Sequence, residues 1–269
     1  MFRPCIDLHE GKVKQIVGGT INDDPSKVRT NYVSDRTSVW YAELYRNDGL
    51  TGGHVIMLGP GNEEPARAAL RAFPGGLQIG GGINLENAPS YLDAGASHVI
   101  ITSWIFQAGR LDLDRLQKLV KALGLKRLVL DLSCRRYNAD YVVVTDRWQK
   151  FTELTITREV LERLADYCAE FLIHAVDVEG LCRGIDSELV EKLGRWTPIP
   201  TTYAGGARSL HDLEEVTRVG QGKIDLTIGS ALDIFGGDGV RYEDAVAFNR
   251  VQGKTDSIAQ ELKLLNGST

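Results

Sequence analysis

The sequence has no long hydrophobic run and no excess of basic residues. No apolar stretch is long enough to cross a bilayer, so we expect no membrane partner. The chain carries 31 Lys and Arg against 36 Asp and Glu, and the resulting net charge of -5 disfavours a nucleic-acid partner. In other respects the composition is typical of a soluble globular protein.

Paired cysteines are also missing. None of the four cysteines forms a Cys-x-x-Cys pair, and their spacing fits neither a zinc site nor a disulfide scaffold. We therefore expect free thiols and no metal site. The first apolar run begins almost at Met1, so we expect no signal peptide and a cytoplasmic location. The cysteines are Cys5, Cys134, Cys168 and Cys182.

Eight short apolar runs alternate with longer amphipathic stretches. Most of the runs lack polar alternation, as expected of parallel strands buried on both faces. Eight such strands in one chain of 269 residues predict an α/β fold, a single (β/α)8 TIM barrel over residues 1–269. The predicted strands are Pro4–Leu8, His54–Leu58, Leu77–Ile79, His98–Ile101, Arg127–Leu132, Phe171–Val176, Thr201–Tyr203 and Leu226–Ile228. The predicted helices are Glu63–Phe73, Leu85–Ala94, Asp112–Leu123, Thr157–Cys168, Asp186–Trp196 and Ser209–Val219.

Two segments are longer than a connection requires, Gly18–Thr37 and Arg135–Thr155. Each directly follows a predicted strand that ends in Asp-Leu. Loops after the strands of a barrel lie on its catalytic face, where long loops usually have a function. We expect both to be loops that cover a site, and we expect a closing helix over Glu243–Asn266.

The second half of the chain repeats the first. The motif Ile6–Leu8 recurs as Leu130–Leu132, 124 residues later (from 7 to 131), and Gly81 and Gly205 are separated by the same 124 residues. The pair Ser103 and Ser230 has a slightly larger offset. We therefore expect two half-barrels, approximately 1–124 and 125–248, related by a pseudo-twofold axis.

The repeated glycine turns predict two phosphate sites. Glycine lets backbone N–H groups approach an anion closely, and Ser and Thr hydroxyls add donors. Each turn alone could be a tight turn and nothing more, but the repetition favours a ligand with a phosphate at each end. A short helix over Ser230–Ile234 would lie behind the second site. The candidate phosphate-binding residues are Gly81, Gly82, Thr102, Ser103, Gly205, Gly206, Gly229 and Ser230.

Asp7 and Asp131 lie near the carboxyl ends of symmetry-related strands. A buried carboxylate is costly unless it is paired or used, and two that face one substrate can act as general acid and general base. The structural alternative is an aspartate paired with Lys12 or Lys14. From the residues alone, the assignment of acid and base stays open.

Weaker candidates surround this pair. His174 lies in the sixth predicted strand, and Asp177 and Glu179 come directly after it. Trp148 and Arg135 belong to the long segment after the fifth strand. Each could orient the substrate, and each could instead be structural or solvated. We interpret His54 and His98 as core residues of their strands.

Several segments together resemble the histidine-biosynthesis isomerases that convert a phosphoribosyl-formimino aminoimidazole carboxamide ribotide aminoaldose to its aminoketose. The resemblance covers about residues 4–242 and is closest to the eukaryotic branch. It implies a barrel of the ribulose-phosphate-binding type, an Amadori rearrangement with Asp7 as base and Asp131 as acid, no cofactor and no metal. It also implies that Trp148 stacks on the substrate. The segments are Cys5–Gln15, Ile79–Ile83, Leu130–Arg135, Ala175–Cys182 and Tyr203–Arg208.

The chain departs from the bacterial pattern of this family at Gln15 and Asn84, where bacterial members tend to have arginine. Glu179 is the nearest match to an acidic residue of the bacterial pattern, with Asp177 as its rival. The alternatives are a barrel like the cyclase of imidazole glycerol phosphate synthase, an aminoaldose isomerase of tryptophan synthesis, and a non-catalytic bis-phosphate-binding barrel. The expected partner is a small bis-phosphorylated substrate, and the expected state is a monomer.

Overall fold

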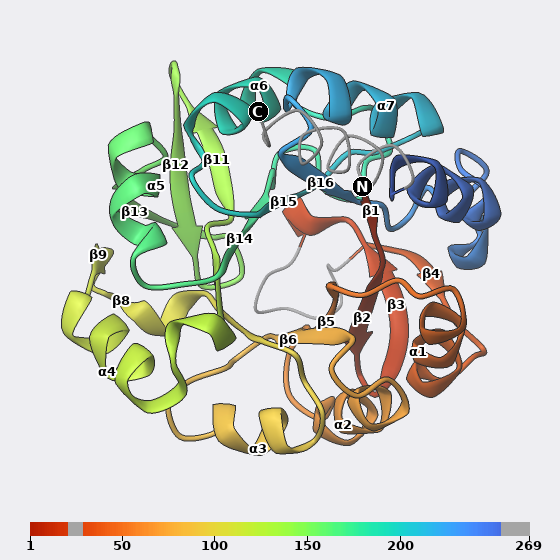
Figure 1. The fold of residues 1–269 in the computed structure, drawn as a ribbon, viewed down its shortest axis with the longest axis horizontal. Helices are drawn as coiled ribbons and strands as arrows, with labels where there is room; N and C mark the ends of the chain where they lie inside the picture. Colours follow the sequence, from red (N-terminus) through yellow and green to blue (C-terminus); the bar gives the residue numbers. More distant parts are fainter. Residues whose placement is uncertain (21–28, 254–269) are drawn as a thin grey trace, which may run out of the picture.

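The computed structural model describes residues 1–20 and 29–253, which form a ring of parallel strands surrounded by helices (Figure 1). The strands pair in the order β16, β15, β14, β10, β7, β6, β5 and β2. The short strand β1 (Phe2–Arg3) pairs with β16 and continues through Pro4 into β2, so the last strand is joined to the first. This closure makes the sheet a (β/α)8 barrel, as predicted.

All eight predicted strands are confirmed, with bounds that differ by at most a few residues. The largest shifts are at the last strand, which begins at Ile224 instead of Leu226, and at the sixth, which ends at His174 instead of Val176. The strands are β2 (Cys5–His9), β5 (Gly53–Met57), β6 (Leu77–Gly80), β7 (Val99–Ile101), β10 (Leu128–Asp131), β14 (Glu170–His174), β15 (Thr201–Ala204) and β16 (Ile224–Thr227).

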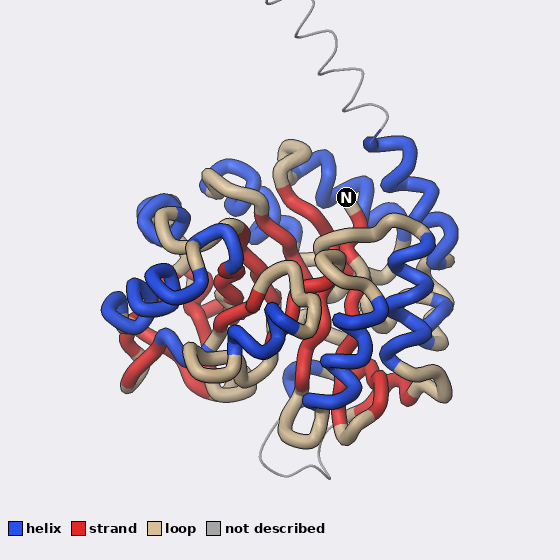
Figure 2. Tube along the Cα trace, turned by 60° about the horizontal axis from the view of Figure 1, so that its bottom comes forward, coloured by secondary structure: helices blue, strands red, loops and turns tan. Residues whose placement is uncertain are grey.

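The six predicted helices are also present, and they lie outside the strands (Figure 2). Asp112, Thr157 and Asp186 act as N-caps, because each side chain accepts a hydrogen bond from a backbone N–H in the first turn. The helices are α2 (Glu63–Ala72), α3 (Ala88–Asp93), α4 (Leu113–Leu123), α5 (Arg158–Ala165), α6 (Ser187–Trp196) and α7 (Leu210–Val219).

Three local predictions were wrong. Helix α1 (Ser38–Asn47) was not predicted, although Thr37 caps it by accepting from the N–H of Trp40. Helix α3 begins three residues later than predicted. The side chain of Asn84 accepts hydrogen bonds from the backbone N–H groups of Glu86 and Asn87 and so holds these residues in a turn. The short helix behind the second glycine turn is η5 (Asp233–Phe235), a 3-10 helix, and it does not begin at Ser230.

The second long segment, Arg135–Thr155, is largely sheet and not loop, whereas the described part of the first, Gly18–Thr37, contains one short strand. In the first half, β3 (Lys12–Ile16) folds back antiparallel to β2, and β4 (Thr30–Val33) pairs with β3. In the second half, β11 (Cys134–Tyr137), β12 (Asp140–Thr145) and β13 (Lys150–Thr155) form a separate antiparallel sheet. Residues 21–28 lie outside the described part of the chain. A further hairpin joins β8 (Phe106–Gln107) and β9 (Arg110–Leu111).

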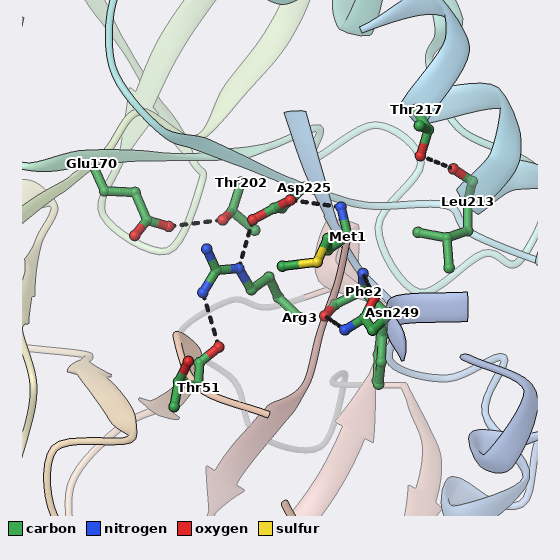
Figure 3. Close-up of polar contacts among 10 residues, drawn as sticks. All are labelled: Met1, Phe2, Arg3, Thr51, Glu170, Thr202, Leu213, Thr217, Asp225 and Asn249. Atoms are coloured by element: carbon green, nitrogen blue, oxygen red, sulfur yellow. Dashed lines mark hydrogen bonds and ion pairs between the residues drawn. The ribbon is translucent and has the colours of Figure 1, made fainter. Parts of the chain in front are cut away.

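Residues 242–253 are helical, which confirms the described part of the predicted closing helix; its remainder lies outside the described residues. Asn249 ties this helix to β1, because its amide donates to the carbonyl of Phe2 and accepts from the N–H of the same residue (Figure 3). Among the described residues, no helix is both long enough and apolar enough to span a membrane.

Side chains inside the ring form layers along each strand. On β14, alternate residues point inward, so Glu170, Leu172 and His174 lie at successive depths. Leu172 belongs to a small apolar cluster inside the barrel, with Ile100, Val129, Ala204 and the partly buried Ile56 packed against it. We infer that this layer separates the polar groups at the two ends of the barrel.

A polar network occupies the amino ends of the strands (Figure 3). The Nε of Arg3 donates to Asp225 at 2.7 Å, and the amino group of Met1 contacts the same carboxylate at 2.6 Å. Nearby, Glu170 accepts from the Thr202 hydroxyl at 2.7 Å and from the Gln78 amide at 2.8 Å. Asp225 therefore joins β16 to β1 at the point where the ring closes.

We expect Asp225→Asn to lower the free energy of unfolding by about 1–3 kcal/mol, since it weakens charged hydrogen bonds across the closing strands. Urea unfolding followed by circular dichroism measures the change. The matched control is Glu153→Gln, which removes the partner of Arg110 in an exposed ion pair and should cost less. Equal losses in the two variants would contradict a special role for the closing contact.

Candidate active site

A cavity of about 490 Å³ opens at the carboxyl ends of the strands. Its lining includes all the candidate site residues of the sequence analysis except Arg135 and Asp177. Both halves of the chain contribute matching positions, because parallel strands of a closed ring all end on one rim. The candidates that line the cavity are Asp7, Gly81, Gly82, Thr102, Ser103, Asp131, Trp148, His174, Glu179, Gly205, Gly206, Gly229 and Ser230.

Asp7 points into this cavity from β2. Its Oδ2 accepts a hydrogen bond from the Nε2 of Gln15 at 3.1 Å. Burial and the nearby charge of Glu179 raise the pKa of Asp7 to about 7, although His174 and Gln15 act in the opposite direction. A carboxyl group with a pKa near 7 is suited to exchange protons at neutral pH.

Asp131 has a different set of neighbours. Its Oδ1 accepts from the hydroxyl of Ser133 at 2.7 Å and lies 3.4 Å from the Nδ1 of His174. Its Oδ2 lies 3.4 Å from the hydroxyl of Thr102. Lys14, one of the two lysines that the structural alternative required, pairs with Glu10 instead.

His174 carries a proton at neutral pH. Burial alone would lower its pKa, but the charge of Asp131 and the hydrogen bond to it raise the pKa to about 9. The pair is almost fully enclosed, with side chains 10% and 8% exposed. The Asp131–His174 pair therefore holds a proton next to the cavity.

Each of the two glycine turns has two successive residues with positive φ. Gly81 and Gly82 have φ of 91° and 72°, and Gly205 and Gly206 have φ of 130° and 75°. A Cβ at Gly81 would lie 2.1 Å from the carbonyl oxygen of Met57, and one at Gly205 would lie 2.8 Å from that of Ala175. Both turns thus require glycine, and both pack against the residue at the end of the preceding strand.

Trp148 lies over the cavity from the turn between β12 and β13. Its ring centroid is 5.7 Å from that of His174. Three successive residues, Asp146, Arg147 and Trp148, have φ between 52° and 66°, a conformation that side chains other than glycine rarely adopt. Such local strain is concentrated at functional sites.

The first half of the chain meets this turn at Gly18. A Cβ at Gly18 would lie 2.4 Å from a ring carbon of Trp148 and 2.8 Å from the Cγ of Glu179. The segment after β3, the turn between β12 and β13 and the segment after β14 therefore meet at the rim.

Arg135 and Asp177 do not reach the cavity. Asp177 is exposed and accepts from the backbone N–H of Arg136 at 2.9 Å. The Nε of Arg135 lies 3.9 Å from the other Asp177 oxygen. The structure thus pairs these two candidates with each other, away from the remaining site residues.

Sequence reasoning missed several cavity residues. His54, interpreted as a core residue, is buried but lines the cavity, and burial and the charge of His174 lower its pKa to about 3. Cys5 lies two residues before Asp7 and pairs in register with His54, so the alternation of strand side chains could have placed both. Gln15 was noted only as a departure from the bacterial pattern, and its place beside Asp7 was not predicted because β3 was not predicted. His98 does not line the cavity and contacts Ser97.

Cys5, Asp7 and His54 are also the side chains here that could hold a metal ion. Among the described residues, their donor atoms form a group within 4.8 Å of one another. Burial raises the pKa of Cys5 well above its ordinary value, so the group presents a thiol and not a thiolate. All four cysteines are free, as predicted.

Comparison with known proteins gives a consistent picture. The family described as "Histidine biosynthesis protein" matches residues 1–238. A chloroplastic protein of Medicago truncatula is 54% identical over 257 residues, which cover 93% of this chain and 82% of the relative. Proteins of Neurospora crassa and Saccharomyces cerevisiae are 53% and 48% identical, over 93% and 94% of this chain and 99% of each relative. All three are named 1-(5-phosphoribosyl)-5-((5-phosphoribosylamino)methylideneamino) imidazole-4-carboxamide isomerase.

We expect His174 to remain protonated at pH 7.5 and to titrate near pH 9, and Asp131→Asn to move this titration to lower pH. Because the folded pKa lies above the ordinary 6.5, the stabilisation is complete below pH 6.5 and is lost as the pH rises through about 9. Imidazole NMR spectra of the two proteins measure the titration, and urea unfolding measures the loss. An unchanged His174 titration in Asp131→Asn would contradict the pair.

Proposed function

The chain belongs to the histidine biosynthesis protein family, and on that premise we propose that its cavity isomerises the bis-phosphorylated aminoaldose of histidine synthesis to the aminoketose. The observation that carries the proposal is the pair of carboxyl groups at matching strand ends, in one cavity that two glycine turns with positive φ also line. An elongated substrate with a phosphate at each end fits this arrangement. The cyclase-like and sensor alternatives have no observation of their own in their favour.

Ring opening needs one proton delivered, and formation of the enolamine needs one proton removed. Protonation of the ribose ring oxygen lets the bond from that oxygen to C1 break, and the nitrogen lone pair forms a protonated imine at C1. Removal of the C2 proton then sends the C–H electron pair toward the imine and gives an enolamine. Tautomerisation, with a proton added at C1 and one lost from the C2 hydroxyl, yields the ketone.

We assign the base to Asp7 and the acid to Asp131 acting with His174. Asp7 must be ionised to accept a proton, so the rate should rise as the pH passes its pKa of about 7. On the other side of the cavity, the proton of the Asp131–His174 pair is present at neutral pH because the pKa of His174 is about 9. An ionised Asp7 can therefore act as the base while the protonated Asp131–His174 pair acts as the acid.

The remaining cavity residues bind and enclose the substrate. The turns at Gly81–Gly82 and Gly205–Gly206, with the hydroxyls of Ser103 and Ser230, bind one phosphate each. The Trp148 ring stacks on the flat imidazole of the substrate and covers the cavity. Glu179 sets the charge around Asp7.

Both halves of the chain line one cavity, which supports a single domain with half-barrels of about 1–124 and 125–248; we also propose a monomer. The four free cysteines fit the cytoplasm as the location.

We expect Asp7→Asn and Asp131→Asn each to lower kcat by about 100- to 10,000-fold, the usual contribution of a general acid or base. A spectrophotometric assay coupled to the downstream cyclase measures turnover. Glu179→Gln is the comparison variant, because it removes a third carboxyl group from the same cavity and should change kcat less. If Glu179→Gln is inactive while Asp131→Asn keeps its rate, the acid assignment fails. Near-normal turnover by Asp7→Asn would overturn the base assignment.

We expect Ser103→Asp and Ser230→Asp each to raise KM at least about tenfold, because each places a negative charge beside one phosphate; tenfold is 1.4 kcal/mol. Steady-state kinetics in the same assay measures KM. Ser97→Asp, which adds the same charge just before β7 at the other end of the strand, is the control. A rise in only one of the two variants would indicate a single phosphate site.

A further inference from the structure

Gln15 is a buried amide that joins two parts of the site. Its side chain is 3% exposed and lies between β2 and the turn after β16. The Nε2 donates to the Oδ2 of Asp7 at 3.1 Å, and the Oε1 lies 3.4 Å from the hydroxyl of Ser230. The amide thus contacts the proposed base with one end and a proposed phosphate turn with the other.

The surroundings hold Gln15 in this position. Its strand, β3, pairs with β2 on one side and with β4 on the other, where Gln15 is opposite Tyr32. Gly229 packs directly against the amide, since a Cβ there would lie 2.4 Å from the Oε1 of Gln15. The Ser230 hydroxyl in turn accepts from the Nδ2 of Asn31 at 3.2 Å.

We propose that Gln15 is a positioning residue that holds the Asp7 carboxyl group at a set distance from the phosphate turn at Gly229 and Ser230. A substrate whose phosphate is bound at this turn then presents its C2 proton to an oriented carboxylate. Gln15 acts through Asp7 and Ser230 and does not itself give or take a proton. The inference rests on the proposed function, because it assigns a substrate phosphate to that turn.

The charge balance around Asp7 explains why the amide matters. Glu179, from the segment after β14, raises the pKa of Asp7, whereas His174, Cys5 and Gln15 lower it. His54 on β5 is neutral, and Tyr45 of α1, whose pKa is raised well above its ordinary value, is neutral as well. Loss of the Gln15 donor therefore leaves Asp7 beside Glu179 with one group fewer to stabilise its ionised form.

The first test is Gln15→Met, which keeps the approximate volume and removes both polar ends. We expect the acidic limb of the kcat/KM profile to move to higher pH. At the pH that is the midpoint for the unchanged protein, kcat/KM of the variant should then lie about 3- to 10-fold below the variant's own plateau. We expect kcat to fall more than KM rises. Gln15→Glu, which puts a second acid beside Asp7, should move the limb further.

Gln78→Met is the matched control. Gln78 is also a buried amide that donates to a carboxylate, the Oε2 of Glu170 at 2.8 Å, but at the other end of the barrel. Both variants should lose similar stability in urea unfolding, whereas Gln78→Met should leave the pH profile unchanged. Equal profiles for the two variants would overturn the proposal.

Two further measurements separate this inference from the proposed function. Carboxyl-carbon NMR of ligand-free protein follows the Asp7 titration directly, and it should move to higher pH in Gln15→Met even if no substrate is turned over. A double-mutant cycle of Gln15→Met with Ser230→Ala should show that the two losses in kcat do not add. An unchanged Asp7 titration, or additive losses, would refute the link; a shifted titration in a protein that does not isomerise would refute the proposed reaction instead.

Discussion

Closure of the parallel ring is the constraint on which the rest of the molecule depends. Because β1 pairs with β16 and β2 with β5, one continuous N-terminal segment bridges the seam of the sheet. Every strand then ends on the same rim, and alternate side chains point inward at defined depths. Asp7 and Asp131 face one cavity for this reason, although 124 residues separate them in the chain (from 7 to 131).

The charges within the cavity depend on one another. His174 is cationic because it lies beside Asp131, and that positive charge, together with burial, keeps the nearby His54 neutral. The same positive charge limits how far burial and Glu179 raise the pKa of Asp7. The ionisable groups of the site are therefore coupled: a change at Asp131 alters the pKa of His174, and the charge of His174 in turn alters the pKa of Asp7. Single substitutions at these positions should have effects that do not add.

The ring, the paired aspartates and the glycine turns could be predicted from the sequence because each leaves a local signal. Buried parallel strands give apolar runs, and a turn that requires positive φ gives glycine. The hairpin β3–β4 and the sheet β11–β13 were not predicted. Tyr141–Val144 is an apolar, β-branched run typical of a strand, but the segment that holds it was interpreted as a loop that covers the site. Gln15 was singled out only as a departure from the bacterial pattern. Its contact with Asp7, and the contact between Gly18 and Trp148, depend on how the chain folds back after β2 and β12, which the local sequence does not show. Arg135 was placed near the site by its distance from β10, but β11 directs it toward Asp177 outside the cavity.

The half-barrel repeat supplies symmetry, but the proposed chemistry requires two different carboxyl groups. Strands β2 and β10 provide equivalent aspartates, and their neighbours make them unequal. Asp7 accepts a hydrogen bond from the amide of Gln15, in the hairpin that follows its strand. Asp131 accepts one from the hydroxyl of Ser133 and lies beside the imidazolium of His174 on β14. None of these donors has a counterpart among the contacts of the other aspartate. The difference between base and acid therefore arises from the side chains around each aspartate, and not from the repeated aspartates themselves.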